Sequence, residues 1–462
     1  MEVLGPWSHG AGPLFRRFAR AVAAAIERGA LADGARLPSE RAVAEAFAIG
    51  RGTAVAAYDV LVADGLVERR QGSGTYVRVS DQPPLPPGRE GSALVHRLVE
   101  RSDPTYELVD LSISVLRDAS GLPPAALASE DLLSVVPDTG YSPWGLPSLR
   151  RAVAAHVTAW GLPTDERQVV ITTGAQQAIS AAAACWVRPG DTVVVDDPTY
   201  PGALAAFLQA GARVVGVPVD HHGVRPDALA AALAARPALV YVQSTVHSPT
   251  GTVLAAARRA RIAALVAAHR VPLVEDLALA DLAWVEAPPP IAAHAPQAPI
   301  AVVGSFSKLL WGGLRLGFVR APEPLALRFA RVKATQDLGT PAVSQLLAER
   351  LLAAVPVSEL RRRRVEELRR RHDVLAGALA RALPTWSWRE PQGGLSLWVD
   401  IGRPSEAFAQ HALRYRVAVA TPAALSPGHA HDHRIRLSFA APPDELEEGV
   451  ARLAAAWGSF RR

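Results

Sequence analysis

The sequence predicts a multidomain protein in which a small α+β unit precedes a larger α/β unit with a mostly parallel sheet. Its 462 residues exceed what one hydrophobic core supports, so we expect two or three domains. Residues 14–79 contain three runs of helical spacing and then two short alternating stretches. From Leu108 onward, short apolar runs alternate with Ala-rich helical runs, which is typical of a sheet covered on both faces.

The small unit, residues 1–79, is predicted to contain three helices and a hairpin. Apolar residues recur at helical spacing from Phe15 to Ile26. A second helix opens at Pro38-Ser39-Glu40, because proline and serine suit the start of a helix. A third helix is expected from Arg51 to about Ala63, and two strands are expected at 66–69 and 75–78 around a turn at 70–74.

A helix, a turn, a helix and a wing in this order form a DNA-reading unit. The second helix of the pair fits a major groove, and the hairpin reaches the adjacent minor groove or backbone. The segments 36–41, 58–61 and 65–77 resemble the winged helix of the GntR regulators. The resemblance implies that the DNA contacts fall on Arg41, Arg51, Thr53, Gln71 and Gly72.

Two features of this unit depart from a simple DNA-binding pattern. Gly50 and Gly52 replace the hydroxyl residues that usually flank Arg51 in the family. The replacement removes possible phosphate or base contacts, so Arg51 has fewer neighbours that could contact DNA. Residues 1–79 hold ten arginines against eight acidic residues, so charge alone does not indicate DNA binding.

A proline-rich segment separates the two units. Residues 80–107 include Gln82-Pro83-Pro84-Leu85-Pro86-Pro87-Gly88 and little that is periodic, which predicts an extended linker. Such a linker lets the DNA-reading unit sit away from its own body or on a partner subunit. Beyond it, strands are expected at 169–171, 192–195, 213–217, 239–242, 272–274, 300–303 and 316–319.

Chemically suggestive residues follow these strands, at the edge of a parallel sheet where ligands bind. Lys308 is one of only two lysines, although the chain has 49 lysines and arginines. An amine can lose its proton and form a Schiff base, which arginine cannot. Tyr200 can stack on a planar ring, Asp276 can pair with a ring nitrogen, and Arg315 suits a phosphate. The helix start at 173–177 offers backbone N–H groups to a phosphate.

This order of a phosphate cradle, a stacking aromatic, an acid and a lysine resembles the fold type I aminotransferases, which hold pyridoxal 5'-phosphate (PLP). The resemblance covers about 108–462 and implies a large domain at about 140–345 and a smaller C-terminal α/β domain at about 346–462. It also implies a role for each matching residue. Lys308 would form the internal aldimine, Asp276 would keep the ring nitrogen protonated, and Tyr200 would stack on the ring. The phosphate would be held by Ala175, Gln176, Ser305 and Arg315. Arg436 would bind the carboxylate of an amino acid, and Tyr141 would bind the cofactor phosphate of a neighbouring subunit.

Two residues depart from the aminotransferase pattern. The family's Asn before Pro-Thr-Gly is Ser248 here, and the tyrosine expected shortly after the acid is absent from Leu277-Ala278-Leu279. Those two groups normally hydrogen-bond the phenolic oxygen of the cofactor and help to set its protonation. Their loss is expected to impair transamination more than cofactor binding, and another donor, such as His247, could compensate.

A GntR-type winged helix joined to an aminotransferase-like body resembles the MocR group of regulators. The resemblance implies a homodimer that binds operator DNA and senses PLP, an amine or an amino acid through an aldimine at Lys308. Two alternatives stay open: an active PLP-dependent aminotransferase with a DNA-binding appendage, and a repressor whose PLP-free domain serves only for dimerisation. Transaminase chemistry is left undecided by the sequence.

The composition and the segments of the chain also bear on its cellular compartment and on metal binding. A single cysteine, Cys185, excludes an intramolecular disulfide and favours a cytoplasmic protein. The first residues lack the pattern of a signal peptide, and the apolar runs are too short to span a membrane. His429, His431 and His433 lie in a segment with glycine and proline, and we predict a loop there without a metal.

Overall fold

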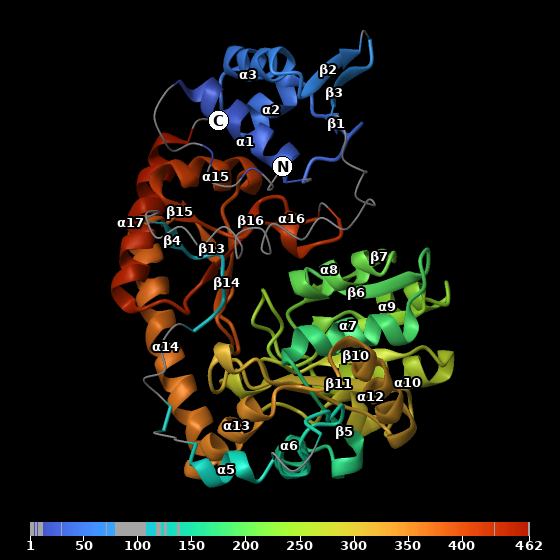
Figure 1. Cartoon of the computed structure of the whole chain (residues 1–462). Helices are drawn as coiled ribbons and strands as arrows, with labels where there is room; N and C mark the ends of the chain where they lie inside the picture. The colour runs from blue at the N-terminus through green and yellow to red at the C-terminus, as the bar shows by residue number, and fades with distance from the viewer. Residues whose placement is uncertain are drawn as a thin grey trace.

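The computed structural model describes residues 4, 7, 13–28, 30–70, 72–78, 108–116, 122–123, 127–135, 139–428 and 430–460. Three sequence predictions, the linker at 80–107, the wing-tip residue Gln71 and His429, lie outside the described residues. Figure 1 shows the N-terminal unit against the C-terminal lobe, and a separate lobe that contains the large sheet.

The N-terminal unit is a winged helix, as predicted. Its three strands form a sheet in the order β1-β3-β2, and the helices pack a core that includes Phe18, Phe47 and Tyr58. Ser39 caps α2, because its hydroxyl accepts a hydrogen bond from the amide of Ala42 at 3.2 Å. The elements are α1 (Leu14–Glu27), β1 (Arg36–Leu37), α2 (Glu40–Ala46), α3 (Arg51–Ala63), β2 (Val67–Arg70) and β3 (Gly74–Val77).

The large lobe contains an eight-stranded sheet in the order β5-β12-β11-β10-β9-β6-β7-β8. All seven strands expected in this part of the chain are present. β6, β7, β9, β10 and β11 run parallel to their neighbours among these five, whereas β12 is antiparallel to both β11 and β5. The strands are β5 (Val169–Thr172), β6 (Thr192–Asp197), β7 (Arg213–Asp220), β8 (Gly223–Val224), β9 (Leu239–Gln243), β10 (Leu273–Asp276), β11 (Ile300–Ser305) and β12 (Gly317–Arg320).

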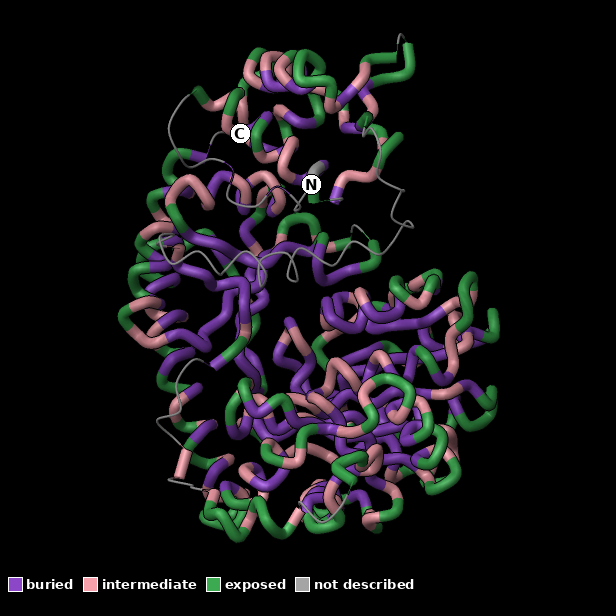
Figure 2. The backbone as a smooth tube through the Cα atoms, viewed as in Figure 1, coloured by how far each residue is buried: buried purple, intermediate pink, exposed green. Residues whose placement is uncertain are grey.

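Helices cover both faces of this sheet. Successive strand residues point to opposite sides, and those on both sides are apolar, so each face needs a covering layer. On β9, Val240 and Val242 join one core, whereas Leu239 and Tyr241 join the other. Figure 2 shows the resulting buried layer between helices that are partly exposed. The first face is covered by α6 (Pro147–Ala159), α9 (Pro226–Leu233), α10 (Ala256–His269), α11 (Ile291–His294) and α13 (Ala342–Ala354), and the second by α7 (Gly174–Trp186), α8 (Pro201–Gln209) and α12 (Glu323–Asp337).

The smaller lobe follows the long helix α14 and has its own core. A three-stranded antiparallel sheet, β13-β14-β16, packs against helices, and β4 pairs with β15. β4 belongs to the segment 108–116, so this part of the chain folds onto the C-terminal lobe. The remaining elements are β4 (Val109–Asp110), α5 (Ser129–Leu133), α14 (Val357–Ala382), β13 (Ser387–Trp388), β14 (Ser396–Asp400), α15 (Ser405–Ala412), β15 (Val417–Ala418), α16 (Pro422–Leu425), β16 (Arg434–Ser438) and α17 (Pro443–Ser459).

The winged helix contacts the smaller lobe through the turn between α2 and α3. Arg414 donates hydrogen bonds to the carbonyl oxygens of Phe47 and Ala48 at 3.2 and 3.1 Å. Trp7 donates to Gln410 at 3.3 Å, and its ring lies 6.0 Å from the Arg414 guanidinium. The winged helix is therefore held on the smaller lobe by hydrogen bonds and ring contacts.

Candidate cofactor site and DNA-binding face

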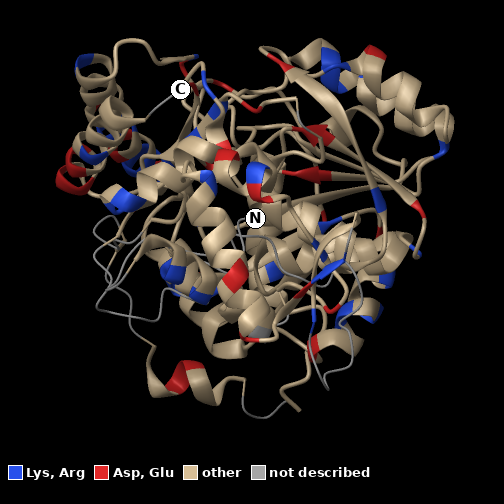
Figure 3. Cartoon of the chain, turned by 90° about the horizontal axis from the view of Figure 1, so that it is seen from above, with Lys and Arg blue, Asp and Glu red and all other residues tan. Residues whose placement is uncertain are grey.

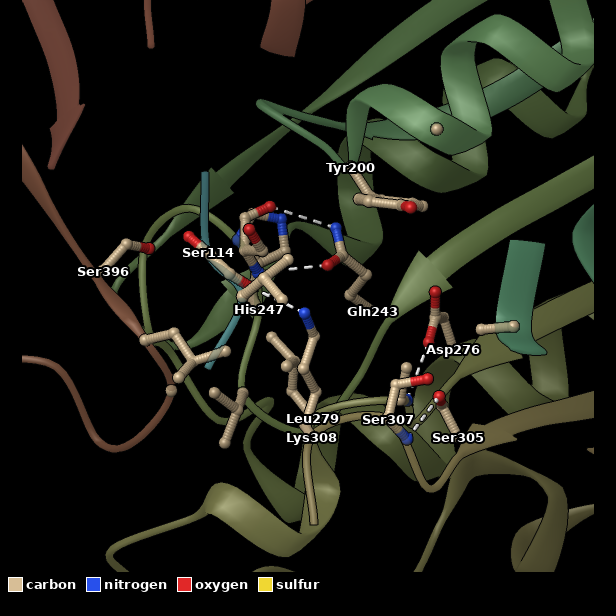
Figure 4. A pocket seen from close by; sticks show the side chains of 18 of the residues that line it. Ser114, Tyr200, Gln243, His247, Asp276, Leu279, Ser305, Ser307, Lys308 and Ser396 are labelled. Carbon is tan, nitrogen blue, oxygen red and sulfur yellow. Dashed lines mark hydrogen bonds between the residues drawn. The ribbon is translucent and has the colours of Figure 1, made fainter. Parts of the chain in front are cut away.

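A cavity of about 450 Å³ opens at the carboxyl ends of the parallel strands, between the two lobes. Tyr200 follows β6, Asp276 ends β10, and Lys308 follows β11. Parallel strands bring their carboxyl ends to one edge of the sheet, so these three side chains reach the same space. Figure 4 shows them around the cavity, with Ser396 on the opposite side from Asp276.

Lys308 is half-buried, and its side chain extends into this cavity. Its Nζ donates a hydrogen bond to the carbonyl oxygen of Ser114 at 2.6 Å. Burial, followed by the positive charges of Arg436 and Arg315, lowers the pKa of Lys308 to about 8. A substantial fraction of this amine is therefore neutral near pH 8, which is the state that attacks a carbonyl carbon.

Asp276 lies at the end of β10, where both of its oxygen atoms are hydrogen-bonded. Oδ2 accepts from the Tyr241 hydroxyl at 2.6 Å, and Oδ1 accepts from the amide of Ala278 at 2.8 Å. Burial nevertheless raises the pKa of Asp276 to about 6, against the lowering effect of these two bonds. A cationic ring nitrogen beside this carboxylate would offset the cost of burying its charge.

The N-terminus of α7 opens into the cavity beside Arg315, where an anion can be held. Gly174 has a φ of +78°, and a Cβ there would lie 3.1 Å from the Arg315 guanidinium. The N–H groups of the first helical turn lack intrahelical partners, so Ala175 and Gln176 can donate to an anion. The Gln176 Oε1 atom is buried and has no hydrogen-bond partner among the described residues. Ser305 lines the same cavity and accepts from the amide of residue 307.

Tyr200 and Arg436 line the cavity from two further elements, the segment after β6 and the strand β16. A Cβ on Gly202 would lie 2.5 Å from the Tyr200 ring, so glycine allows the ring to lie against the backbone. Burial raises the pKa of Tyr200, and the hydroxyl therefore stays protonated. Arg436, on β16, is buried and donates from Nη2 to the carbonyl oxygen of Ser112 at 2.5 Å.

Sequence reasoning missed four residues of this site. Tyr241 was expected only as part of a strand, yet its hydroxyl contacts Asp276. Gln243 lies in the cavity and was overlooked, although a polar residue that ends an apolar strand is a usable signal. Ser112 and Ser114 contribute backbone carbonyl oxygens, and such a contribution leaves no trace in side-chain chemistry.

The two departures from the aminotransferase pattern also lie at the cavity. Ser248 and Leu279 line it, and leucine offers no hydrogen-bond donor. His247 lines the cavity, but its Nδ1 lies 2.8 Å from the Thr250 hydroxyl and its Nε2 lies 3.4 Å from Asp196. Both ring nitrogens of His247 are therefore close to other protein groups.

Tyr141 lies outside this cavity within the single chain. Its residue surface is 67% exposed, and it is absent from the described cavity lining. The structure thus brings together every predicted cofactor and carboxylate residue except Tyr141.

The predicted DNA contacts lie on the winged helix. Arg51 is the first residue of α3, and both Arg51 and Arg41 are exposed, while Thr53 is half-buried. Gly72, at the wing, has a φ of +73°, which glycine adopts readily. Figure 3 shows basic and acidic residues interspersed over the view from this side of the molecule.

Comparison with known proteins relates both units to known families. Residues 15–77 match bacterial regulatory proteins of the gntR family, and residues 106–453 match aminotransferase class I and II. The uncharacterized HTH-type transcriptional regulator YisV of Bacillus subtilis (strain 168) is 30% identical, over 96% of this chain and 95% of its own. The probable rhizopine catabolism regulatory protein MocR of Rhizobium meliloti is 27% identical, over 69% and 68% respectively. The chain is a MocR-type regulator of the GntR family.

The aminotransferase part of this MocR-type regulator also has solved structural neighbours. LysN, an α-aminoadipate aminotransferase from Thermus thermophilus complexed with N-(5'-phosphopyridoxyl)-L-leucine, superposes with a TM-score of 0.68. It is 27% identical and covers 76% of this chain and 92% of its own. The family and fold together make pyridoxal 5'-phosphate the cofactor of this domain.

The cavity fits this cofactor. The glycine-lined helix start with Arg315 suits its phosphate, the buried Asp276 suits its ring nitrogen, and the Lys308 amine suits its aldehyde. When bound, the cofactor supplies an electron-withdrawing ring to an attached amine. The protein's own part is to orient the ring, to exclude water and to hold the proton at the ring nitrogen.

Two further features bear on the setting of this MocR-type regulator. Within the described ranges, no helix is long and apolar enough to cross a membrane. The same ranges contain no group of three or more His, Cys, Asp or Glu residues that could hold a metal ion. His431 instead lies 3.5 Å from Asp197, and His433 lies 3.2 Å from Asp400.

Proposed function

We propose that this regulator binds operator DNA as a cytoplasmic homodimer and that its aminotransferase-like domain senses PLP, an amine or an amino acid through Lys308. The segment 111–116 carries this proposal. It belongs to the first described stretch after the linker from the DNA-binding unit, and it bonds both Lys308 and Arg436.

These two bonds connect ligand binding to the position of the segment. The Ser114 carbonyl oxygen accepts from Lys308, and the Ser112 carbonyl oxygen accepts from Arg436. A cofactor aldehyde and an effector carboxylate need the same amine and guanidinium, so the ligand and the segment compete. A ligand that favours one arrangement of the segment shifts the population of states, which is the requirement for a sensor.

The exposure of Tyr141 supports the homodimer. A tyrosine that is 67% exposed contributes little to its own cavity but can reach a neighbouring one. Leu338, half-exposed at 50%, precedes Gly339, and a Cβ on this glycine would lie 2.8 Å from the backbone of Ser142. Tyr141 and Leu338 thus lie on adjacent segments that a second copy could cover.

A second candidate function is transamination, because all four charged residues that the aminotransferase resemblance implies are present in the cavity. Lys308, Asp276, Arg315 and Arg436 all line the cavity. LysN holds a cofactor–leucine adduct in the corresponding domain, which supports an amino acid as the ligand here. Ser248 and Leu279 weigh against efficient turnover, since neither is the usual donor toward the cofactor's phenolic oxygen.

The test measures cofactor binding and DNA binding on the full-length protein. We expect reconstitution with PLP to give a visible absorbance band that Lys308→Ala abolishes. Lys333→Arg is the matched control, because Lys333 is the only other lysine and pairs with Asp337 at 2.7 Å. Footprints on the upstream DNA of the chain's own gene, with and without PLP and candidate amines, should differ in affinity.

Three outcomes separate the candidate functions. Affinity for DNA that changes with PLP or an amine supports sensing. An unchanged affinity, together with steady multiple turnover of an amino acid and a keto acid, supports the transaminase. A wild type that stays colourless after reconstitution leaves only a dimerisation role for this domain.

A further inference from the structure

We infer that the Gln243 side chain donates a hydrogen bond to the phenolic oxygen of the cofactor ring, in place of the asparagine and tyrosine that Ser248 and Leu279 replace. The inference rests on the proposed binding of PLP at Lys308. A buried anionic oxygen needs a donor, because an unpaired buried charge is costly.

The position of Gln243 suits this role. It is the last residue of β9 and lies beside Asp276 in the parallel register with β10. Its residue surface is 7% exposed, and the side chain lines the cavity. In Figure 4 the amide lies between Tyr200 and Lys308. The phenolic oxygen sits on the ring carbon next to the one that bears the aldehyde, so its donor must lie near the lysine.

The surroundings orient the Gln243 amide. Its Oε1 accepts from the Ser248 amide at 3.1 Å, and its Nε2 donates to the Ser248 carbonyl oxygen, also at 3.1 Å. These two bonds fix which end of the side chain carries the N–H groups. The glutamine is thereby held against the backbone of the residue that replaces the family's asparagine.

One N–H of this amide is available to a new acceptor while the bonds to Ser248 are kept. The second contact of Nε2 is with the Thr199 hydroxyl oxygen at 3.4 Å, which is long for a hydrogen bond. Thr199 does not depend on that contact, because its hydroxyl already donates to Asp196 at 2.5 Å. Exchanging this weak contact for a bond to an anionic oxygen is favourable.

The other nearby groups are less suited to this role. Leu279 has no donor, and the His247 Nδ1 atom already lies 2.8 Å from the Thr250 hydroxyl. The rivals are the Ser248 hydroxyl and two buried atoms without a hydrogen-bond partner among the described residues, His247 Nε2 and Ser114 Oγ. Ser248→Ala is the matched control, and His247→Phe and Ser114→Ala are measured beside it.

The experiment is a pH titration of the visible absorbance of the full-length protein reconstituted with PLP. A donor stabilises the deprotonated oxygen, so Gln243→Met should raise the midpoint by about 1–2 pH units. Gln243→Glu, which replaces the donor with an acceptor, should raise it as well and serves if the first variant folds poorly. Ser248→Ala should leave the midpoint within about 0.3 units of wild type.

The inference is overturned if Gln243→Met and Gln243→Glu both titrate like the wild type, or if a variant of one of the three rivals carries the shift. A wild type without any visible band overturns both this inference and cofactor binding at Lys308. A normal band with an unchanged midpoint overturns only the role of Gln243.

Discussion

The substitution Asp276→Asn removes a buried charge and keeps the shape and hydrogen bonding of the side chain. The carboxylate accepts from the Tyr241 hydroxyl at 2.6 Å and from the Ala278 amide at 2.8 Å. In the variant, the asparagine oxygen can keep the bond from Ala278. Its amide nitrogen can donate to Tyr241, because a hydroxyl both donates and accepts. The variant therefore tests the charge alone.

The magnitude follows from the pKa of Asp276, which rises from 3.8 in the unfolded chain to about 6 in the fold. The folded state therefore binds more protons than the unfolded state in this window, and stability falls as the pH rises through it. The difference of about 2.2 pH units corresponds to about 3 kcal/mol, of which about 1.4 kcal/mol falls between pH 5 and pH 8. Above about pH 7 the cost is nearly constant.

The assay is urea unfolding of the cofactor-free wild type and variant at pH 5 and pH 8, followed by tryptophan fluorescence. We expect the variant to gain about 1.4 kcal/mol relative to wild type between the two pH values. With PLP bound, the wild type should be the more stable of the two proteins, because the ring nitrogen has no counter-charge in the variant. The affinity of the variant for PLP should fall by at least about 100-fold. An unfolding difference that is the same at both pH values would refute the reasoning.

Three further predictions concern single groups. The rate of PLP capture should rise about tenfold per pH unit below the Lys308 pKa of about 8 and level off above it, as measured by stopped-flow absorbance. Tyr241→Phe should weaken PLP binding more at pH 6.5 than at pH 8.5, because losing its hydrogen bond raises the pKa of Asp276 further; equal losses at both pH values would contradict this. Arg51→Ala should cost about 1–3 kcal/mol of operator affinity in a gel-shift titration. The exposed body residue Arg261 is the control, since Arg261→Ala makes the same charge change and should cost little.

Much of the fold could be predicted because the large sheet is buried on both faces. Its strands are near-continuous apolar runs, so all seven expected strands are present. β1 and β4 were not predicted, since two residues carry no periodicity. β4 also depends on pairing with β15, more than 300 residues away in the chain, and no local pattern encodes that contact.

The site residues could be predicted where a reactive side chain follows a strand. They could not be predicted where the direction of a side chain or the path of the backbone decides the contact. Lys308 belongs to a residue type that occurs only twice in the chain, and Lys308, Asp276 and Tyr200 all lie at or just after strand ends, so the pattern indicated them. Gln243 becomes informative only when its amide is placed beside Ser248, because sequence alone does not show which way a long side chain turns. The carbonyl oxygens of residues 112 and 114 could come from any residue type, and only the backbone path places them.

A continuous set of contacts in the smaller lobe joins the cavity to the DNA-binding unit. Arg436, in the cavity, exchanges backbone hydrogen bonds with Ala420, and the segment from Arg416 to Ala418 pairs with the start of 108–116. Arg414, just before it, bonds the turn between α2 and α3. A path of contacts is not yet coupling, which requires that both ends bias one two-state element.

Arg414→Ala tests this coupling directly. The side chain faces the winged helix and lies outside the cofactor cavity, so the visible spectrum and PLP affinity should stay those of the wild type. If the 413–420 segment transmits the signal, the ratio of operator affinities with and without PLP should collapse toward 1 in the variant. A variant that keeps the wild-type ratio would show that the signal reaches DNA by another route, such as the partner subunit, because removing an element that transmits the signal must change the coupling free energy between the two sites.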